Sequence, residues 1–592
     1  MIPVSSSGLG TIQVQLAGEL GRAITSSREN RLRRFISGIE SDPISLFGPE
    51  KRAEARAGDW YGEHAGKWLI AASNALLQTR DPQLRSTIET VADYLVSTQE
   101  PDGYMGTYAP DGPRFTRAET EGTRTWDVWT HAYLLLGLLA AYRAIPKEAY
   151  KLAGDRIVAL MRETFSGRPI LSYGNHQGLS SLIVIHPLAE WSLEFGDSGA
   201  ADLAESLLER SESLDPVGKL LRGEDVAAIG TGKIYQIEWL LEGLVALSRV
   251  TGRQDLLEAA KRGWSSIREH HLTLLGGPWG GIGRHKEVFN DPGYFSPFGM
   301  VETCSAMAWI GLNRALHAAD PLTDYPEEIE RTLLNTILGA ADPNGEDWAY
   351  FTFPNGRRNP TYDWACCKSS GAIALEWAPL TFYRSIDGGI AIDGFGPSEA
   401  VIPRTNGEPI EVRQETRFPA DSRIDVSLAS SDKLGKIQVR IPRWTQAPSI
   451  EIDGVKGPVC IPGTYLDLDF SGQNRVRLRL DFPMPIKVHR AAHSIDHHGQ
   501  EIVRDDYFAL TRGPIVYAAG LLDGYKKAET LRAPHLNLES RFEDVEGSES
   551  ALGPTIHLRL PDHSPIELKP YVEAGGRSQG TWRATWLGVA WQ

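Results

Sequence analysis

The spacing of apolar residues changes near residue 390, and this change limits the folds that the chain can adopt. Between about residues 12 and 385 the apolar side chains recur at helical spacing, as in GKWLIAASNALLQ (66–78) and HAYLLLGLLAAYRAI (131–145). After about residue 390 they alternate with period two, as in RVRLRLDF (475–482), between segments rich in Gly, Pro, Asn and Asp. The sequence therefore predicts a helical part followed by an antiparallel β part.

The helical segments come in pairs joined by short polar turns such as TRDPQL (79–84) and TGRQDLLE (251–258). Counting a first helix at about 12–38, we expect about twelve helices in six pairs. Six hairpins in a ring make an (α/α)6 helical barrel, and an open helical solenoid is the alternative. The closed ring is favoured because aromatic and polar residues crowd the loops between pairs, as they would around a central pocket.

The predicted fold class is therefore multidomain α + β. The three predicted domains are an (α/α)6 barrel catalytic domain at 1–388, a β-sandwich domain at 389–485, and a second β-sandwich or C-terminal β region at 486–592. Sandwiches behind helical barrels usually buttress the barrel or assist assembly. We therefore expect no chemistry in the β part, and we expect a possible homodimer through it.

Charge and composition restrict the partners. The formal net charge is −15 with no run of Lys and Arg, which argues against nucleic acid or an anionic membrane and favours a neutral ligand. The N-terminus lacks the basic and apolar regions of a signal peptide, and no apolar run approaches the ~20 residues that span a bilayer. Four cysteines form no disulfide framework in so long a chain, so the expected location is the reducing cytoplasm.

Two of the four cysteines, Cys366 and Cys367, are adjacent in DWACCKSSG. Neighbouring side chains point apart on a strand or a helix, so they meet at one point only on an irregular turn. Upstream, Glu302 and Cys304 in GMVETCSAMAW can converge at a helix start. Together the four residues make a Cys3Glu set suited to tetrahedral Zn²⁺. Core filling by buried cysteines and a strained vicinal disulfide are the alternatives, while Cys460 in the β part is expected to fill space.

A glycine-rich segment, GGPWGGIGRHKEVFNDPGYFSPF, carries Glu287 just before an aromatic residue. A carboxyl group held against apolar neighbours has a raised pKa and can act as a general acid. A solvated glutamate in a loop is the alternative.

Aromatic and polar residues of the barrel loops are predicted to line a sugar pocket, because sugar sites combine aromatic platforms with a few polar groups. Glu63 and His64 in DWYGEHAGKWL rank highest, since they precede a helix whose apolar face begins at Trp68. Simple helix packing is the alternative for each of the candidates, which are Glu63, His64, Asp127, Gln236, Trp279 and His285.

Read together, these motifs resemble glycoside hydrolase family 127, the β-L-arabinofuranosidases that use a zinc-bound cysteine as nucleophile. The resemblance rests on KEVF, ETC, the CC pair with its following helix, QEPDGYMGTY (99–108) and LTRGPIVY (510–517). It implies an (α/α)6 barrel followed by β-sandwich domains. It also implies that Glu302, Cys304 and Cys367 are zinc ligands, that Cys366 is both ligand and nucleophile, and that Glu287 is the acid/base.

The same resemblance also indicates which residues would contact the sugar. His186, in IHPLAEWSLEFGD, is similar to a sugar-binding histidine of the family, and a packing or capping histidine is the alternative. Lys233, in GTGKIYQIEW, stands where the family commonly has a histidine, and TWDVWTHAYLL (125–135) also departs from the usual pattern. Lys233 is expected to contact substrate and would suit a carboxylate-bearing sugar, although a structural lysine is the alternative.

The resemblance thus implies a retaining exo-glycosidase that releases a terminal β-L-arabinofuranose-like sugar from a glycoside. A retaining pair requires the Cys366 sulfur about 5–5.5 Å from the Glu287 carboxyl group. A glycosidase for an acidic or deoxy sugar of plant polysaccharides is the first alternative. A carbohydrate lyase or epimerase, and a non-enzymatic carbohydrate-binding protein with structural zinc, are the others.

Overall fold

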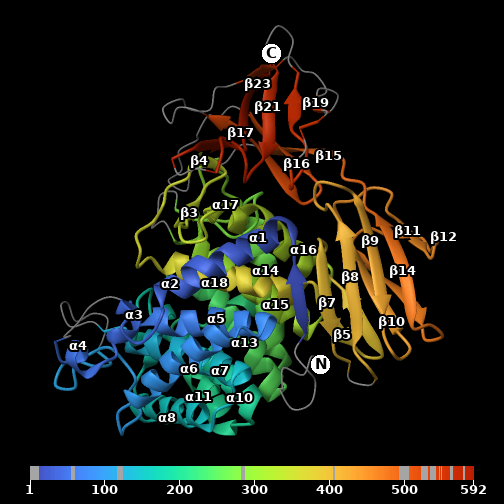
Figure 1. The fold of residues 1–592 in the computed structure, drawn as a ribbon. Coiled ribbons are helices and arrows are strands. Elements are labelled where there is room, and N and C mark those ends of the chain that lie inside the picture. Colours follow the sequence, from blue (N-terminus) through green and yellow to red (C-terminus); the bar gives the residue numbers. More distant parts are fainter. Residues whose placement is uncertain are drawn as a thin grey trace.

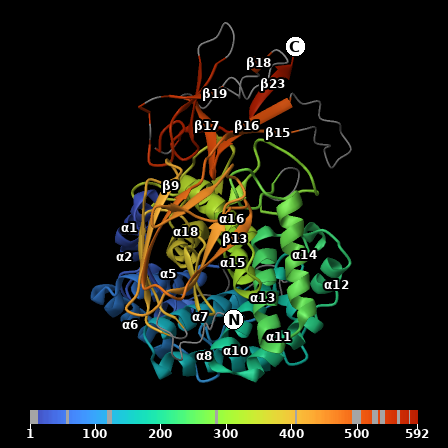
Figure 2. The same cartoon turned by 90° about the vertical axis from the view of Figure 1, so that its right-hand side faces the viewer.

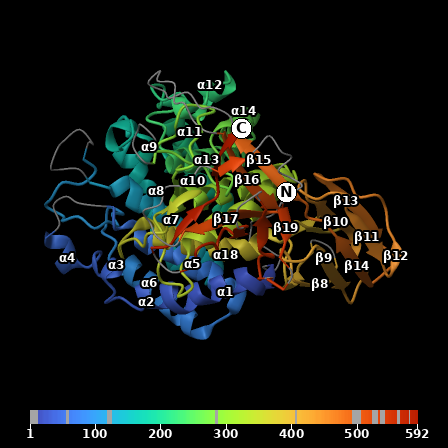
Figure 3. The ribbon, with the colours of Figure 1, turned by 90° about the horizontal axis from the view of Figure 1, so that it is seen from above.

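The computed structural model describes residues 12–591 apart from 55–59, 117–124, 282–286, 405–406, 492–505, 522–530, 534–541, 546, 549, 560–564 and 578–579. Figures 1 and 2 show a helical barrel, a β-sandwich against its side and a C-terminal β region at its upper end. Seen from above, the sandwich lies beside the helices and the C-terminal strands lie over them (Figure 3).

Six helices form the inner wall of the barrel. They contact one another in chain order, and the last contacts the first, so the ring is closed. This arrangement excludes the open solenoid. The inner helices are α5 (Glu63–Thr79), α7 (Asp127–Ala144), α10 (Ile185–Phe195), α13 (Ile234–Thr251), α15 (Thr303–Ala319) and α18 (Cys366–Trp377).

A second layer of helices surrounds this wall, and its members are amphipathic because only one face is covered. The outer helices are α1 (Gly18–Ser27), α6 (Pro82–Ser97), α8 (Glu148–Thr164), α11 (Ser198–Glu209), α14 (Gln254–His270) and α16 (Asp324–Arg331). The predicted (α/α)6 barrel is therefore confirmed.

The turns between paired helices follow simple backbone chemistry. Gly196 ends α10 with φ of 68°, a left-handed conformation that costs glycine little. Asp197 then caps α11, because its side chain accepts hydrogen bonds from the backbone amides of Gly199 and Ala200. The polar turn thereby ends one helix and starts its partner within two residues.

The N-terminus differs from the expected helix at about 12–38. Residues Gln13–Leu16 form strand β1, and the helix that follows is divided into α1, a π-helical turn η1 (Arg28–Leu32) and α2 (Arg33–Phe35). Strand β1 pairs with β7 of the sandwich. Residues Gln13–Leu16 thus connect the barrel to the β-sandwich.

The sandwich consists of two sheets around one apolar core. Burial alternates along its strands, as in β14, where Val476, Leu478 and Leu480 face the core. One sheet has the order β1, β7 (Ser398–Ile402), β8 (Ile410–Thr416), β9 (Arg423–Ala429), β14 (Arg475–Asp481), β11 (Ser449–Ile452) and β12 (Val455–Lys456). The other has the order β13 (Thr464–Phe470), β10 (Gly435–Ile441), β6 (Gly389–Ile392) and β5 (Tyr383–Ile386). Pairing is antiparallel except between β6 and β10, which are parallel.

The C-terminal strands form one connected sheet that also incorporates a strand of the barrel. Its main order is β18 (Leu531–Ala533), β23 (Leu587–Trp591), β16 (Asp506–Arg512), β17 (Ile515–Leu521), β21 (Ile566–Pro570), β20 (Ile556–Leu558) and β19 (Phe542–Asp544). Strand β15 (Ile486–Ala491) pairs with β16, and β22 (Trp582–Ala584) pairs with β17 and with β4 (Asn355–Arg357).

Strand β4 belongs to the long segment between α16 and α18, so the C-terminal sheet anchors that segment. The Asn355 side chain donates to the Trp586 carbonyl oxygen (2.7 Å), and the Tyr571 hydroxyl donates to the Phe353 carbonyl oxygen (2.6 Å). Among the described residues, no helix is long and apolar enough to cross a membrane.

Candidate active site

Three cysteines and one glutamate converge where two inner helices begin. The Cys304 sulfur lies 3.4 Å from that of Cys366 and 3.5 Å from that of Cys367, and the two adjacent sulfurs are 3.9 Å apart. One carboxylate oxygen of Glu302 joins them, and the four ligand atoms all lie within 4.8 Å of one another. All four cysteines of the chain are free thiols, so the vicinal disulfide is excluded in this structure.

The backbone explains this convergence. Glu302 is the N-cap of α15 with extended backbone (φ −69°, ψ 134°), and Cys304 lies in the first turn, so residues i and i+2 reach the same point. Cys366 and Cys367 are the first two residues of α18. The adjacent cysteines therefore lie in the first turn of a helix, and not on an irregular turn before it as expected. Both pairs lie at positive helix ends, which favour thiolates.

The cluster fits a zinc ion by its chemistry and its dimensions. For zinc–sulfur bonds of ~2.3 Å, a regular tetrahedron has sulfur–sulfur edges of ~3.8 Å. The three measured separations, 3.4, 3.5 and 3.9 Å, bracket this value. Three soft thiolates and one carboxylate are a donor set that suits Zn²⁺.

Cys366 differs from the other members of the cluster. It is 9% exposed, whereas Cys304, Cys367 and Glu302 are 1%, 0% and 3% exposed, so its sulfur is the most accessible to a ligand. Its pKa lies well below the ordinary value because the Cys304 and Cys367 thiols donate to its sulfur, with help from the charge of Lys67. Burial, by contrast, raises the pKa of Cys304 and Cys367 well above the ordinary value.

Tyr350 connects Cys366 to Glu287. Its hydroxyl group donates to Glu287 Oε1 at 2.7 Å and lies 3.6 Å from the Cys366 sulfur. The Thr303 amide donates to the Tyr350 carbonyl oxygen (3.0 Å), next to the pairing of β2 (Val301–Glu302) with β3 (Phe351–Thr352). The start of α15 thus fixes this tyrosine beside the cysteine cluster.

Lys233 occupies the space between two carboxylates. This N-cap residue of α13 donates from Nζ to Glu287 at 2.5 Å and to Glu302 at 3.0 Å. The Glu287 carbonyl oxygen accepts from the Ile234 amide (3.0 Å), which holds the loop against α13. The lysine therefore positions both acids, and its charge is already matched by protein groups.

The expected raised pKa of Glu287 is not found. Burial of this carboxyl group raises its pKa, but the adjacent Lys233 ammonium and the Tyr350 hydroxyl outweigh burial, so the pKa is lowered. Glu302 shows the opposite balance: burial dominates and raises its pKa to about 8. The sequence pattern could not reveal this difference, because Lys233 lies 54 residues from Glu287.

Glu63, the first residue of α5, forms a buried ion pair with Lys67 in the next turn of the helix. Lys67 donates to Glu63 Oε1 at 2.9 Å, and the Trp129 indole nitrogen donates to the other oxygen. Lys67 is 0% exposed and Glu63 is 1% exposed. Burial raises the pKa of Glu63 to about 7, against the opposing charge of Lys67. Both carboxylate oxygens of Glu63 are thus bonded to side chains of the inner helices α5 and α7.

We expect Lys67→Met to destabilise the protein by about 3–5 kcal/mol, because Glu63 is left as an uncompensated buried acid. The free energy of unfolding in urea measures this loss. Arg413→Met is the matched control, since Arg413 pairs with Glu399 and Glu415 on the surface, where a pair contributes about 0–1 kcal/mol. A loss for Lys67→Met no larger than that of the control would contradict a tightly coupled buried pair.

His64 supports the segment that carries the cysteine pair. Its two ring nitrogens lie 3.0 Å from the Ser369 hydroxyl oxygen and 3.0 Å from the Trp364 carbonyl oxygen, on either side of Cys366 and Cys367. Burial lowers the pKa of the imidazole to about 3, so the ring is neutral. Its hydrogen-bonding atoms are therefore engaged with protein groups.

The other predicted sugar-contacting residues have the following surroundings. Asp127 accepts from the Tyr104 hydroxyl (2.7 Å) and the Phe115 amide (2.6 Å), so both oxygens hold the protein together. Trp279 is buried and stacks on Tyr294. Gln236, in the first turn of α13, has a buried Oε1 with no hydrogen-bond partner among the described residues. His285 lies outside the described residues.

His186 lines a cavity of the barrel that does not include the cysteine cluster. It is in the first turn of α10, and its Nδ1 accepts a hydrogen bond from the Trp239 indole nitrogen at 2.6 Å. The cavity that it lines is formed largely by the middle and last turns of the inner helices. The structure therefore separates His186 from the cysteine cluster.

Sequence reasoning missed Tyr350, Lys67 and Glu238. Tyr350 directly precedes β3 and Lys67 lies in α5, and nothing in the local sequence pattern of either residue is unusual. Glu238 is buried with both carboxylate oxygens lacking a hydrogen-bond partner among the described residues, and burial raises its pKa well above the ordinary value. It follows Lys233 by five residues on α13, a spacing without a distinct signal.

Comparison with known proteins identifies the family. Residues 22–155 and 201–377 match the family description "Beta-L-arabinofuranosidase, GH127 catalytic domain", and residues 389–484 match the GH127 middle domain. The first match alone covers more than half of the chain. The chain belongs to glycoside hydrolase family 127 (GH127). It is therefore a glycoside hydrolase, and the lyase, epimerase and non-enzymatic alternatives are not supported.

Relatives of this GH127 chain agree with the assignment. It is 22% identical over 517 residues to the non-reducing end β-L-arabinofuranosidase of Bifidobacterium longum subsp. longum, covering 77% of this chain and 75% of the relative. Its fold is similar to that of a GH127 β-L-arabinofuranosidase from Geobacillus stearothermophilus T6, with a TM-score of 0.77, 18% identity, and 98% and 100% of the two chains covered. A GH127 β-arabinofuranosidase matches with a TM-score of 0.76, 18% identity, and 98% of each chain covered.

Proposed function

We propose that this GH127 chain is a retaining exo-β-L-arabinofuranosidase with Cys366 as nucleophile and Glu287 as acid/base. The proposal rests on one observation above all. Cys366, the most exposed residue of the Cys3Glu cluster, is linked through the Tyr350 hydroxyl group to Glu287 of the glycine-rich loop. Family membership and the names of the relatives support the sugar.

The separation of the two groups supports double displacement. The Cys366 sulfur and Glu287 Oε1 are no farther apart than the sum of their distances to the Tyr350 oxygen, 3.6 and 2.7 Å. Retaining pairs of carboxylates lie ~5–5.5 Å apart and inverting pairs ~6.5–9.5 Å apart. This upper limit on the distance between the Cys366 sulfur and Glu287 Oε1 lies below the inverting range. An inverting mechanism needs the larger separation to place a water molecule beside the substrate.

The cluster residues Glu302, Cys304, Cys366 and Cys367 would hold a Zn²⁺ ion, which supplies charge that keeps the Cys366 sulfur deprotonated. In the first step that sulfur attacks the anomeric carbon, and the bond to the leaving oxygen breaks as Glu287 gives it a proton. In the second step the Glu287 carboxylate takes a proton from water, and the resulting hydroxide displaces the sulfur from the sugar. Two inversions retain the anomeric configuration.

Lys233 favours the carboxylate form of Glu287, which is the form required in the second step. Because its ammonium is already bonded to two protein carboxylates, Lys233 offers no free charge to a sugar acid. The acidic-sugar alternative thereby loses the feature that favoured it. Arabinose is accordingly the sugar that we propose.

Hydrolysis of a panel of nitrophenyl glycosides tests the proposal. We expect the β-L-arabinofuranoside to be cleaved with the highest kcat/KM, and NMR of the first product formed to show retained β configuration. A uronide or deoxy-glycoside cleaved faster would support the alternative sugar. An initial α product would contradict the double displacement.

Tyr350→Phe should lower kcat about 10–100-fold while the zinc content remains at the wild-type level. The hydroxyl group donates to Glu287 and its oxygen lies 3.6 Å from the Cys366 sulfur, and both contacts are lost without any change to the cluster ligands. Tyr142→Phe is the matched control, since that tyrosine packs on Phe195 near the last residues of α7. Unchanged kcat in Tyr350→Phe would show that the tyrosine has no positioning role.

A further inference from the structure

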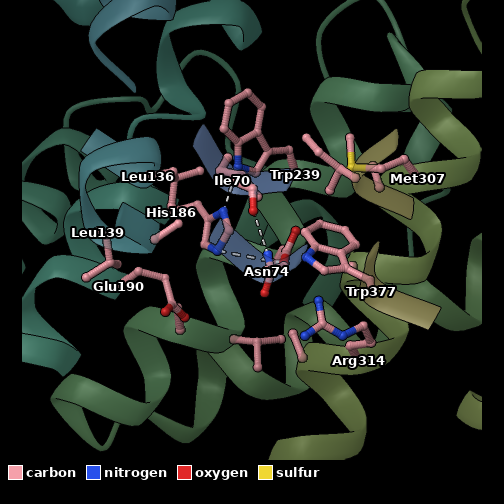
Figure 4. Close-up of a pocket in the computed structure, with 18 of the residues that line it drawn as sticks. Ile70, Asn74, Leu136, Leu139, His186, Glu190, Trp239, Met307, Arg314 and Trp377 are labelled. Carbon is pink, nitrogen blue, oxygen red and sulfur yellow. Dashed lines mark hydrogen bonds and ion pairs between the residues drawn. The ribbon is translucent and has the colours of Figure 1, made fainter. Parts of the chain in front are cut away.

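A cavity of about 250 Å³ lies toward the end of the barrel where the inner helices finish, away from the cysteine cluster. We call it the lower cavity. All six inner helices line it, largely with residues from their middle and last turns, whereas the cysteine cluster lies at the first turns of α15 and α18. Residues at its opening, such as Arg249 and Trp377, are exposed or half-buried. Figure 4 shows the side chains around it.

An aromatic layer separates the lower cavity from the cysteine cluster. The Tyr133 and Tyr235 hydroxyl groups are hydrogen-bonded to each other across the ring, and Trp239 packs against both. On the cluster side, the Lys67 ammonium lies 4.9 Å from the centre of the Tyr133 ring. The lower cavity is thus a separate space and not an extension of the proposed active site.

The polar groups of the lower cavity have unused hydrogen-bonding capacity. Arg314 lies over the Trp377 ring (4.7 Å to its centre), and it has no hydrogen bond or ion pair with the residues that the structure describes. Glu242 approaches His186 Nε2 only to 3.8 Å, too long for a hydrogen bond, and accepts none from the described part of the chain. Because His186 Nδ1 accepts from Trp239, its Nε2 carries the proton and can donate.

A purely structural role explains some of these charges but not all. Arg143 and Arg249 lie in the last turns of α7 and α13, where a cation stabilises the negative helix end. Arg143 is also bonded to Glu190 and Glu194. Arg314 precedes the last turn of α15 and has neither role. Arg314 lines the cavity and makes no hydrogen bond or ion pair with the described residues.

The charges select the kind of ligand. Arg314 can only donate and Glu242 can only accept, so a ligand between them must accept from one and donate to the other. A hydroxyl group does both. A ligand carboxylate would meet Glu190, Glu242 and six negative helix ends, and a ligand ammonium would meet the arginines. A neutral polyol is therefore favoured over either ion.

We propose that the lower cavity binds one neutral sugar ring. Trp239 and Trp377 line the cavity and offer apolar surface to the C–H groups of a sugar, while Arg314, Glu242 and His186 bind its hydroxyl groups. The volume is below the ~300–1,000 Å³ of sites for drug-sized ligands, which fits a single ring and not an oligosaccharide. This site is independent of the proposed function.

Calorimetric titration of the whole chain tests the proposal. The neutral probes are L-arabinose, D-xylose, D-glucose and D-galactose, and the charged probes are D-galacturonate and D-galactosamine, which share the galactose ring. We expect saturable binding of at least one neutral sugar, and binding of both charged probes at least tenfold weaker than that of D-galactose or undetectable.

Two variants locate the binding. Arg314→Met removes the guanidinium group, and Ala140→Phe fills the opening from α7. Each should weaken the binding at least tenfold while leaving the zinc content and the thermal unfolding midpoint close to wild type. The proposal is overturned if no neutral sugar binds, if binding is unchanged in both variants, or if a charged probe binds as tightly as D-galactose.

Discussion

Replacing Cys366 with alanine is expected to lower kcat/KM by about 10⁴–10⁶-fold, the loss seen when a catalytic nucleophile is removed. The reason is that no other group of the cluster can take its place. Cys304 and Cys367 are 1% and 0% exposed, so neither residue is accessible to a substrate. The measurement is the rate of hydrolysis of the nitrophenyl β-L-arabinofuranoside.

Cys460→Ala is the matched control. This fourth cysteine is a buried free thiol in the core of the β-sandwich, remote from the cluster in the fold, and its loss should leave kcat/KM unchanged. A Cys366→Ala enzyme that keeps more than about a tenth of the wild-type rate would exclude Cys366 as nucleophile. Equal losses in the two variants would point to a general effect of removing a buried thiol.

Removing the metal should abolish activity and lower the stability of the barrel. The ligands come from α15 and α18, so an ion bound there joins two inner helices. A ligand present at 1,000 times its dissociation constant stabilises the folded state by ~4 kcal/mol. For a unit the size of this barrel, such a loss lowers the unfolding midpoint by about 5 °C.

The measurement is differential scanning calorimetry before and after dialysis against a chelator. Adding Zn²⁺ back should restore both the midpoint and the activity. The Cys304→Ser variant should resemble the chelated protein, because it lacks one ligand while Cys366 remains. A chelated protein with a wild-type midpoint and full activity would contradict a resident metal.

The helical period and the polar turns were sufficient to predict the barrel, because each hairpin buries one apolar face in the same way. Closure of the ring depended on contacts between α18 and α5, about 300 residues apart, which no local pattern encodes. Strand β1 was missed because four residues, QVQL, are too short for a period to be recognised and were included in a helix.

The cysteine cluster could be predicted because three residues of an uncommon type lie in short motifs. The residues that surround the cluster could not be predicted. Lys233 was expected to contact substrate, yet it bridges Glu287 and Glu302, an arrangement set by the meeting of α13 with the glycine-rich loop. Tyr350 reaches the site only because β3 pairs with β2. Such roles depend on tertiary contacts, which sequence spacing does not specify.

X-ray absorption at the zinc edge of the purified wild-type protein tests the central claim most directly. We expect one zinc per chain with three sulfur atoms at ~2.3 Å and one oxygen at ~2.0–2.2 Å, from Cys304, Cys366, Cys367 and Glu302. A shell of nitrogen and oxygen alone, or a fully active sample without zinc, would contradict the account.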